Sequence, residues 1–300
     1  MSSVQVVVPA YNPGQLLRRA LDSVRSQTFT DWECLVLDDG GAEDLGWVDG
    51  YGDDRVSRVR QPNAGVSIAR NVGVATSTAP LIAFLDQDDE WLPSKLGRQI
   101  SALRDARNDP ALCYTDFWWV TGDHEARSGD QTVTYEGLLA DQHICLSSVL
   151  VSRDAYWRVG GHNPLLAQMQ DWDLFLRLLM TGAPSARVAE PLVRYHLHQA
   201  NASRDYLTAR AERLELLSQH QRHAARQSKD AVVAACAKGR RRTDELFGAQ
   251  AYDRARSSLR QGRTEGFRHL ARAVRWSPST VGRGAASFAR PAGQRVTSPT

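Results

Sequence analysis

Residues 81–89 read Leu-Ile-Ala-Phe-Leu-Asp-Gln-Asp-Asp, a short apolar run that ends in an acidic cluster. Five consecutive apolar residues are typical of a strand that is buried on both faces of a sheet. Residues 4–8 form a similar run before Ala10-Tyr11-Asn12, and residues 34–37 form another before Asp38-Asp39. Parallel strands end at one edge of a sheet, where α/β proteins bind their ligands, so we expect the three polar clusters to meet there.

Helical patterns lie between these strands. Asn12 and Pro13 suit the N-cap and first turn of one helix, and residues 66–75 and 93–107 carry the apolar spacing of two more. Further strands are expected at 56–59, 112–120 and 191–197, and a further helix from Gln170. This alternation predicts an α/β fold with a mixed, mainly parallel sheet flanked by helices, over residues 1–204.

The remaining residues differ in charge. Residues 1–204 carry 18 Lys+Arg and 26 Asp+Glu, a balance of −8, whereas residues 205–300 carry 19 and 8, a balance of +11. We predict a basic C-terminal helical extension over 205–280, broken at Gly239, Gly248 and Gly262, and a flexible tail over 281–300, which is rich in Gly, Ser and Pro.

The basic extension has two open interpretations. Its surface would suit the headgroups of an anionic membrane, or it forms a helical cap or a homodimer contact with a solvated basic face. Nucleic acid is not an expected partner, because the Arg-rich segment lacks the interleaved aromatic residues of a known binding module.

Composition excludes several classes of protein. No apolar run approaches the ~18 residues that span a bilayer, and residues 1–8 lead into a strand without a basic leader segment. The four cysteines are too widely spaced for a zinc motif or a disulfide framework. We therefore expect a cytoplasmic protein that is at most peripheral to the inner face of the membrane.

The Asp86-Gln87-Asp88 triplet is the first candidate site. Two carboxylates in one small volume repel each other unless a cation lies between them, and oxygen ligands suit Mg²⁺ or Mn²⁺. The alternative is a solvated turn before the next helix.

The segment from Gln61 to Asn71 is the second candidate site. Its loop runs into a helix, whose N-terminal amides attract anions, and Arg70 lies where it can reach a phosphate. Arg70 could instead pair with a surface carboxylate, and Asn63 could be an N-cap. Because neither G-x-G-x-x-G nor G-x-x-x-x-G-K-[ST] is present, dinucleotide dehydrogenases and P-loop NTPases are disfavoured.

Eight motifs over residues 3–203 occur together in a recognisable order, and two of them are Ser26-Gln27-Thr28-Phe29 and Trp32-Glu33. The other six are Pro9-Ala10-Tyr11-Asn12, Leu37-Asp38-Asp39-Gly40, Gln61-Pro62-Asn63-Ala64-Gly65, Ala69-Arg70-Asn71, Phe84-Leu85-Asp86-Gln87-Asp88-Asp89 and Gln170-Asp171-Trp172-Asp173. In this order they resemble family 2 glycosyltransferases of the GT-A fold. The resemblance implies inverting transfer of a sugar from a nucleotide diphosphate donor, with a UDP-sugar favoured and Mn²⁺ or Mg²⁺ as cofactor.

The resemblance also implies a role for each matching residue. Those expected at the nucleotide sugar are Pro9, Tyr11 and Asp39 around the base, Asp86 at the ribose, Arg70 at the diphosphate, and Asn63. Asp88 and His198 are the expected metal ligands, and Asp171 is the expected catalytic base. Two positions depart from the family pattern: Gly41 stands where serine is usual, and Gln170 where glutamate is usual.

The acceptor is open: a saccharide, a lipid-linked glycan or a small molecule would each suit synthesis of a bacterial polysaccharide or glycoconjugate. Two other functions are considered. A nucleotide-sugar-binding protein without turnover would not need Asp171 and Asp88. A nucleotidyltransferase would usually have a Gly-rich loop after the first strand, where this chain has Pro9-Ala10-Tyr11-Asn12-Pro13.

Overall fold

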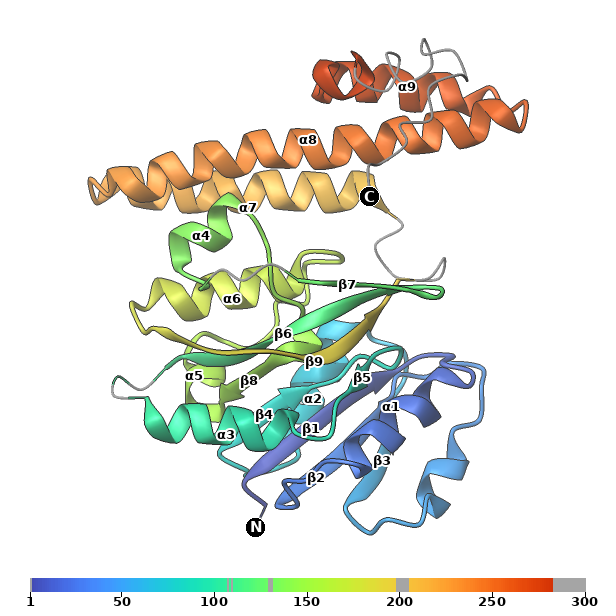
Figure 1. Cartoon of the computed structure of the whole chain (residues 1–300), viewed down its shortest axis with the longest axis vertical. Coiled ribbons are helices and arrows are strands. Elements are labelled where there is room, and N and C mark those ends of the chain that lie inside the picture. Colours follow the sequence, from blue (N-terminus) through green and yellow to red (C-terminus); the bar gives the residue numbers. More distant parts are fainter. Residues whose placement is uncertain (1, 107, 109, 129–131, 198–204, 283–300) are drawn as a thin grey trace, which may run out of the picture. The chain divides into compact units, whose positions relative to one another are not determined.

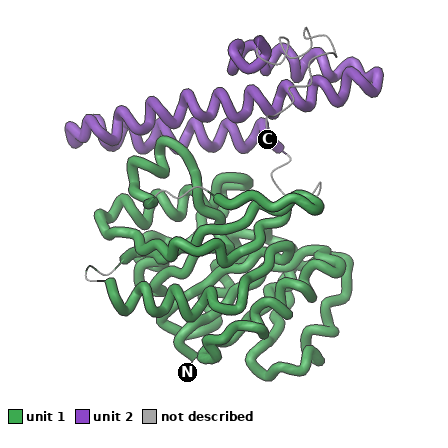
Figure 2. The backbone as a smooth tube through the Cα atoms, viewed as in Figure 1, with its two compact units in different colours: residues 1–204 green, residues 205–300 purple. Residues whose placement is uncertain are grey.

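The computed structural model describes residues 2–106, 108, 110–128, 132–197 and 205–282 (Figure 1). The chain divides into two compact units, residues 1–204 and residues 205–300 (Figure 2). The predicted flexible tail lies outside the described residues from 283 onward.

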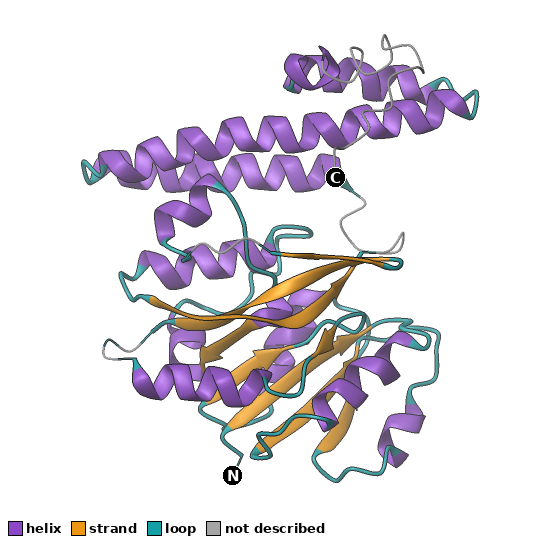
Figure 3. Cartoon of the chain, in the orientation of Figure 1, coloured by secondary structure: helices purple, strands orange, loops and turns teal. Residues whose placement is uncertain are grey.

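One mixed sheet runs through the first unit (Figure 3). Its strand order is β3 (Val56–Arg60), β2 (Trp32–Asp38), β1 (Val4–Ala10), β4 (Leu81–Phe84), β8 (Val149–Ser152), β6 (Leu112–Thr121), β9 (Ser185–His196) and β5 (Glu90–Trp91), and β7 (His124–Arg127) pairs with β6. The first four strands are parallel, whereas β8 is antiparallel to both of its neighbours. The predicted α/β class with a mixed, mainly parallel sheet is confirmed.

The helices of this unit connect the strands. They are α1 (Leu16–Arg25), α2 (Val66–Ala75), α3 (Lys95–Asp105), α4 (Tyr135–Ala140), α5 (Arg153–Arg158) and α6 (Gln170–Met180), with short 3₁₀ turns at Gly46–Gly50 and Leu146–Ser148. The helices predicted at 66–75 and from Gln170 are confirmed.

The predicted start of the first helix is wrong. This helix begins at Leu16, not at Pro13, and Asn12 adopts φ 45°. The Asn12 side chain accepts hydrogen bonds from the backbone N–H groups of Ala42 and Glu43, so it caps the loop after β2 instead of the helix.

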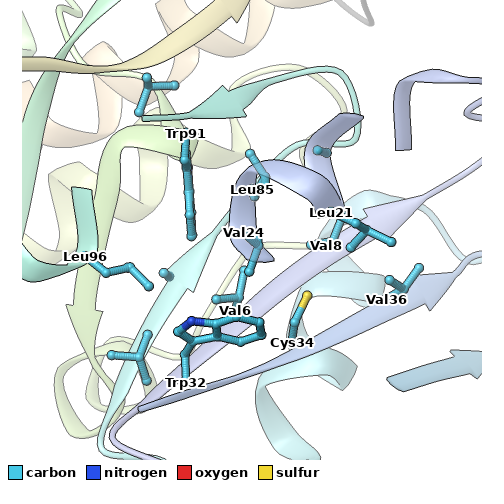
Figure 4. Close-up of a cluster of buried hydrophobic side chains, with 14 of the residues drawn as sticks. Val6, Val8, Leu21, Val24, Trp32, Cys34, Val36, Leu85, Trp91 and Leu96 are labelled. Atoms are coloured by element: carbon cyan, nitrogen blue, oxygen red, sulfur yellow. The ribbon is translucent and has the colours of Figure 1, made fainter. Parts of the chain in front are cut away.

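The apolar core fixes the register of the sheet and of the helix above it. Figure 4 shows Val6 and Val8 of β1 packed with Leu21 and Val24 of α1, beside the Trp32 ring of β2. These side chains are essentially inaccessible to water. Since a shift of one residue along β1 would exchange the side chains on its two buried faces, this packing also fixes where β1 ends and the polar residues after it begin.

The second unit contains α7 (Tyr206–Arg226), α8 (Asp230–Arg260) and α9 (Glu265–Trp276). The predicted breaks at Gly239 and Gly248 are wrong, because α8 continues through both residues, which are buried. A β-carbon on Gly248 would lie 2.5 Å from the Ser277 side chain, so this glycine permits close packing of the segment after α9. Only Gly262, with φ 70°, lies at a break.

Helix α9 has an apolar strip on its solvent side. Phe267 and Val274 are 64% and 48% exposed and lie seven residues, or about two helical turns, apart, with Leu270 half-buried between them. Arginines 260, 263, 268 and 275 are exposed nearby in sequence, and none forms an ion pair with a described carboxylate. Among the described helices, none has both the length and the apolar content needed to cross a bilayer.

Candidate functional site

Three parallel strands bring the polar clusters to one edge of the sheet. In the register, Ala10 of β1 lies opposite Asp38 of β2, and Val7 opposite Phe84 of β4. The backbone N–H of Tyr11 donates to the Gln87 side chain at 2.8 Å, which ties the ends of β1 and β4 together. The expected meeting of the clusters is confirmed.

The Asp39 carboxylate holds the loop that follows β3. Asp39 is buried and accepts hydrogen bonds from the Gln61 side chain at 2.7 Å and from the backbone N–H groups of Ala64 and Gly65 at 2.9 and 3.0 Å. Asn63 lies exposed in this loop. A carboxylate offers about four acceptor sites, so one stays open to a further donor. The contact of Asp39 with a base stays a prediction.

The turn after Asp39 depends on two glycines. Gly40 has φ 72°, and a β-carbon there would lie 2.6 Å from the backbone nitrogen of Asn63. A β-carbon on Gly41 would lie 2.5 Å from the Asn12 side-chain oxygen. The departure at Gly41 therefore has a structural reason: this turn has no room for serine while Asn12 caps it.

The remaining residues predicted around the base lie on β1 or directly after it. Pro9 is buried within the strand opposite Leu37, so it shapes the edge through the backbone. Tyr11 follows the strand with an exposed ring, available to stack on a ligand.

Arg70 joins two of the predicted site residues. It extends from α2, is 3% exposed, and its two terminal nitrogens lie 2.6 Å from Asp86 Oδ1 and 2.7 Å from Asp171 Oδ1. Asp86 follows β4, and Asp171 is in the first turn of α6, so the arginine connects elements far apart in sequence. The contact of Arg70 with a diphosphate stays a prediction. In the free protein Arg70 contacts the carboxylates of Asp86 and Asp171.

The same arginine separates the pKa values of the two carboxyl groups. Burial raises the pKa of Asp86, which repulsion from Asp171 also raises and Arg70 only partly offsets. Burial by itself would raise the pKa of Asp171 as well, but the charge of Arg70 lowers it, a proton donated by His162 would lower it further, and the pKa lies below its usual range. Asp171 is therefore ionised at neutral pH, as a proton-accepting base must be.

Sequence reasoning missed a buried group behind Asp171. His162 is fully buried, with Nε2 3.4 Å from Asp171 Oδ1. Its Nδ1 lies 2.9 Å from the Tyr156 hydroxyl, which donates to Asn71 Oδ1 at 2.5 Å. Gly160 and Gly161, both with positive φ, form the turn that leads into His162, and this glycine pair is the signal that could have drawn attention to it.

A second missed group supports the acidic loop. The Ser147 hydroxyl donates to Asp89 Oδ2 at 2.5 Å and accepts from the backbone N–H of Asp86 at 3.1 Å. The other oxygen of Asp89 accepts from the backbone N–H of His196 at 3.1 Å. Burial raises the pKa of Asp89 well above its usual range, and repulsion from Asp86 and Asp88 adds to this. Asp89 is thus a structural link between β4 and β9.

Asp88 is half-buried in this loop, and its backbone carbonyl accepts from Arg19 at 2.9 Å. No cluster of three metal-ligating side chains occurs among the described residues. One hard carboxylate oxygen beside the acidic loop fits a divalent cation of the Mg²⁺ type, which protein carboxylates often hold singly or in pairs together with substrate phosphates. His198, the other predicted ligand, lies outside the described residues.

Comparison with known proteins shows similarity to glycosyltransferases. Residues 5–136 match the family model described as Glycosyl transferase family 2. An uncharacterised glycosyltransferase of Haemophilus influenzae is 25% identical over 213 residues, covering 67% of this chain and 71% of that protein. The Escherichia coli enzyme UDP-Glc:alpha-D-GlcNAc-diphosphoundecaprenol beta-1,3-glucosyltransferase WfgD is 31% identical over 152 residues, covering 49% of this chain and 59% of that enzyme.

A third relative and a solved structure agree with these matches. The putative teichuronic acid biosynthesis glycosyltransferase TuaG of Bacillus subtilis is 26% identical over 202 residues, covering 65% of this chain and 79% of that protein. The crystal structure of S. aureus TarS 1-349 in complex with UDP-GlcNAc superposes with a TM-score of 0.61 and 16% identity, covering 88% of this chain and 93% of that one. At this identity the likeness shows a shared fold.

Proposed function

We propose that this chain catalyses an inverting sugar transfer. The premise is that residues 5–136 form a glycosyl transferase family 2 domain and that the chain is a glycosyltransferase with the GT-A fold. The donor is a nucleotide diphosphate sugar, with a UDP-sugar favoured, and the acceptor presents a hydroxyl group. The observation that carries the proposal is the ionised Asp171 carboxylate at the ligand-binding edge of the sheet, paired with Arg70 and near Asp86.

Asp171 acts as the general base. It removes the proton of the acceptor hydroxyl while the acceptor oxygen attacks the anomeric carbon on the face opposite the nucleotide, and a single displacement of this kind inverts the configuration. The departing diphosphate gains negative charge, and Arg70 stabilises it electrostatically. Tyr11, Asp39 and the backbone at Pro9 bind the base, Asp86 binds the ribose, and Asn63 also contacts the nucleotide sugar.

Asp88 would hold the divalent cation, with His198 as a second ligand. When bound, Mn²⁺ or Mg²⁺ supplies positive charge at the leaving diphosphate. The carboxylate chemistry of Asp88 and the repulsion it exerts on Asp86 and Asp89 support this assignment, because a cation relieves that repulsion.

The names of the relatives support a role in bacterial polysaccharide or lipid-linked glycan synthesis. The name of the E. coli enzyme specifies a UDP-glucose donor and a diphosphoundecaprenol-linked acceptor, and the name of the B. subtilis protein specifies teichuronic acid biosynthesis. The aligned part of this chain spans 59% and 79% of these two proteins, so donor sugar and acceptor are proposed here by class only.

A peripheral contact with the cytoplasmic leaflet completes the proposal. The apolar strip of Phe267, Leu270 and Val274 on α9, near the exposed arginines 260, 263, 268 and 275, which form no ion pair with a described carboxylate, has the composition of a helix that lies in a membrane interface. The +11 balance of residues 205–300 favours anionic lipids. Such a contact would bring the enzyme to a lipid-linked acceptor.

The decisive experiment measures release of the nucleotide diphosphate from a panel of nucleotide sugars, with Mn²⁺, with Mg²⁺ and with EDTA. The matched control is Asp171→Asn, which keeps size and hydrogen bonding but cannot accept the proton; its turnover should fall at least ~10²-fold while donor affinity stays within about twofold. Donor binding without turnover in the wild type would favour the nucleotide-sugar-binding alternative. Loss of donor affinity in Asp171→Asn would make Asp171 a binding residue.

A further inference from the structure

The hydrogen bonds around Asn71 fix the orientation of its amide. Asn71 Nδ2 donates to the backbone carbonyl of His162 at 2.8 Å, and Asn71 Oδ1 accepts from the backbone N–H of His162 at 2.9 Å. If the amide oxygen and nitrogen were exchanged, the Asn71 NH₂ group would face the His162 N–H, and the Asn71 oxygen would face the His162 carbonyl, so neither hydrogen bond could form. The atom of Asn71 that faces Tyr156 is therefore an oxygen, which carries no proton.

This orientation determines the proton on Tyr156. The Tyr156 hydroxyl oxygen lies 2.5 Å from Asn71 Oδ1 and 2.9 Å from His162 Nδ1. A hydroxyl has one proton, and two oxygens cannot approach to 2.5 Å without a proton between them, so Tyr156 donates to Asn71. Towards His162 the hydroxyl oxygen can then only accept, and His162 Nδ1 must carry a hydrogen.

A neutral imidazole with a proton on Nδ1 has none on Nε2. His162 is neutral at pH 7, because burial lowers its pKa to about 4; the contact with Asp171 opposes this shift, and the positive charge of Arg70 adds to it. The charged and titratable groups facing the ring are Asp171, Arg70, Arg177 and Tyr156. Nε2 therefore presents a lone pair to the Asp171 carboxylate.

The geometry at Nε2 agrees with this assignment. Nε2 is buried and lies 3.4 Å from Asp171 Oδ1, yet it makes no aligned hydrogen bond. A lone pair facing a carboxylate oxygen is an unsatisfied arrangement in the free protein. It becomes a hydrogen bond when the carboxyl group gains a proton, and catalytic hydrogen bonds that are long in a free enzyme commonly tighten at that stage.

We propose that His162 is a positioning residue whose Nε2 accepts a hydrogen bond from Asp171 once Asp171 has taken the proton of the acceptor hydroxyl. The inference rests on the proposed function. In the step, the acceptor O–H bond breaks and its proton passes to the Asp171 carboxylate. The acceptor oxygen bonds to the anomeric carbon, and the bond from that carbon to the diphosphate oxygen breaks, its electron pair leaving with the nucleoside diphosphate.

This arrangement gives Asp171 two opposed neighbours. Arg70 stabilises the ionised form and so weakens Asp171 as a base, whereas the His162 lone pair stabilises only the protonated form and so strengthens it. The opposite tautomer, with a proton on Nε2, would donate to the carboxylate and weaken the base further. The two tautomers therefore predict opposite effects when His162 is replaced.

The first test reads the tautomer of the full-length wild-type protein directly and needs no activity. The protein is labelled with ¹⁵N-histidine, and the ring nitrogens of His162 are assigned as the signals lost in His162→Phe. At pH 7 we expect Nδ1 to show a protonated nitrogen and Nε2 an unprotonated one. A proton on Nε2, or a charged ring, would overturn the proposal.

The second test follows kcat against pH for the wild type, His162→Phe and the exposed control His124→Gln, with thermal unfolding to show that each is folded. His162→Phe keeps a ring against Phe84, which packs on His162 edge to face at 5.1 Å. We expect kcat to fall about tenfold, equivalent to ~1.4 kcal/mol, and KM for the donor to change less than twofold. The acidic limb should move to lower pH, because Asp171 loses the neighbour that stabilises its protonated form.

The inference would be overturned if the acidic limb of the kcat–pH profile of His162→Phe moved to higher pH, or if it stayed in place with an unchanged kcat. Failure of the proposed function looks different: Asp171→Asn would then retain turnover, whatever His162→Phe does. If Asp171→Asn is inactive and the acidic limb of His162→Phe moves to higher pH, the base assignment stands, but His162 has the opposite tautomer and donates a hydrogen bond from Nε2 to Asp171.

Discussion

Replacing Arg70 by methionine should destabilise the first unit by about 3 to 5 kcal/mol at pH 7, the range for breaking a buried ion pair by removing one partner. The arginine is 3% exposed, and the carboxylates it pairs with, Asp86 and Asp171, retain 27% and 25% exposure. Methionine fills much of the same volume but carries no charge. Two partly buried carboxylates are then left to repel each other without a cation, and the desolvation of each is no longer offset.

The loss should depend on pH in a stated direction. Arg70 lowers the pKa of Asp171 in the folded protein, and such a carboxyl contributes stability that is present above its unfolded pKa of about 3.9 and is lost as pH falls through the folded value. The variant lacks this contribution, and its two carboxylates can bind protons at mildly acidic pH. The gap between wild type and variant should therefore be widest near neutrality and narrow below about pH 5.

Thermal unfolding followed by circular dichroism and tryptophan fluorescence, at pH 7 and pH 5, measures this gap. At about 2 to 4 °C per kcal/mol for a unit of this size, the melting temperature should fall by roughly 6 to 20 °C at pH 7. The matched control is Arg98→Met, which removes an exposed pair with Glu190 at 3.2 Å and should cost at most ~1 kcal/mol. An Arg70→Met loss no larger than that of the control, or one that does not shrink at pH 5, would refute the reasoning.

Three shorter predictions concern other parts of the chain. Asp88→Ala should abolish transfer and remove the response to added Mn²⁺ while leaving the melting temperature within about 2 °C, since removing this half-buried carboxylate also removes its repulsion of Asp86 and Asp89; near wild-type turnover in metal-containing buffer would end the metal role. Gly248→Ala should destabilise the second unit by ~1 to 3 kcal/mol because its β-carbon would overlap Ser277, whereas Gly97→Ala on α3, with no neighbour closer than 3.9 Å, should be neutral or stabilising; unfolding curves in which both behave alike would contradict the packing argument. The wild type should sediment with anionic vesicles at low salt but not with neutral ones, and Phe267→Ser should weaken this binding several-fold; equal binding to neutral vesicles would remove the electrostatic membrane contact.

The sequence predicted the sheet because its central strands are strongly marked. Continuous apolar runs at the positions of β1, β2 and β4 exclude most other structures, and the polar residues that end them show where the ligand-binding edge lies. Helix α2 was predicted to the residue because its apolar spacing and the loop before it agree.

Local signals misled where a distant contact outweighed them. Asn12 has the composition of an N-cap, yet its oxygen bonds the loop after β2, and this long-range contact moved the helix start to Leu16. Glycine commonly interrupts helices, but at Gly248 the close approach of Ser277 gives the missing side chain a packing role, so α8 continues. In both cases residues 29 or more positions away decide the outcome.

The candidate site likewise has some features that the sequence predicts and others that depend on distant contacts. A strand-end aspartate such as Asp86 and a first-turn aspartate such as Asp171 can be identified from sequence, because their neighbours along the chain define their places. The neighbours that set the pKa of Asp171 cannot be identified in this way: Arg70 reaches it from 101 positions away, and Asn71, which orients Tyr156 and His162, bonds His162 across 91 positions.

Asn71 directly follows Arg70 on α2, so one short segment controls both neighbours of Asp171. Arg70 acts on Asp171 through its charge, and Asn71 acts by determining the tautomer of His162. It follows that a substitution at Asn71 should change turnover without touching Asp171. Asn71→Asp would preserve the acceptor for Tyr156 but lose the donor to His162, and Asn71→Leu would lose both. A graded fall in kcat, larger for leucine, is the outcome that this chain of hydrogen bonds requires; equal effects of the two variants on kcat would show that Asn71 acts only by packing.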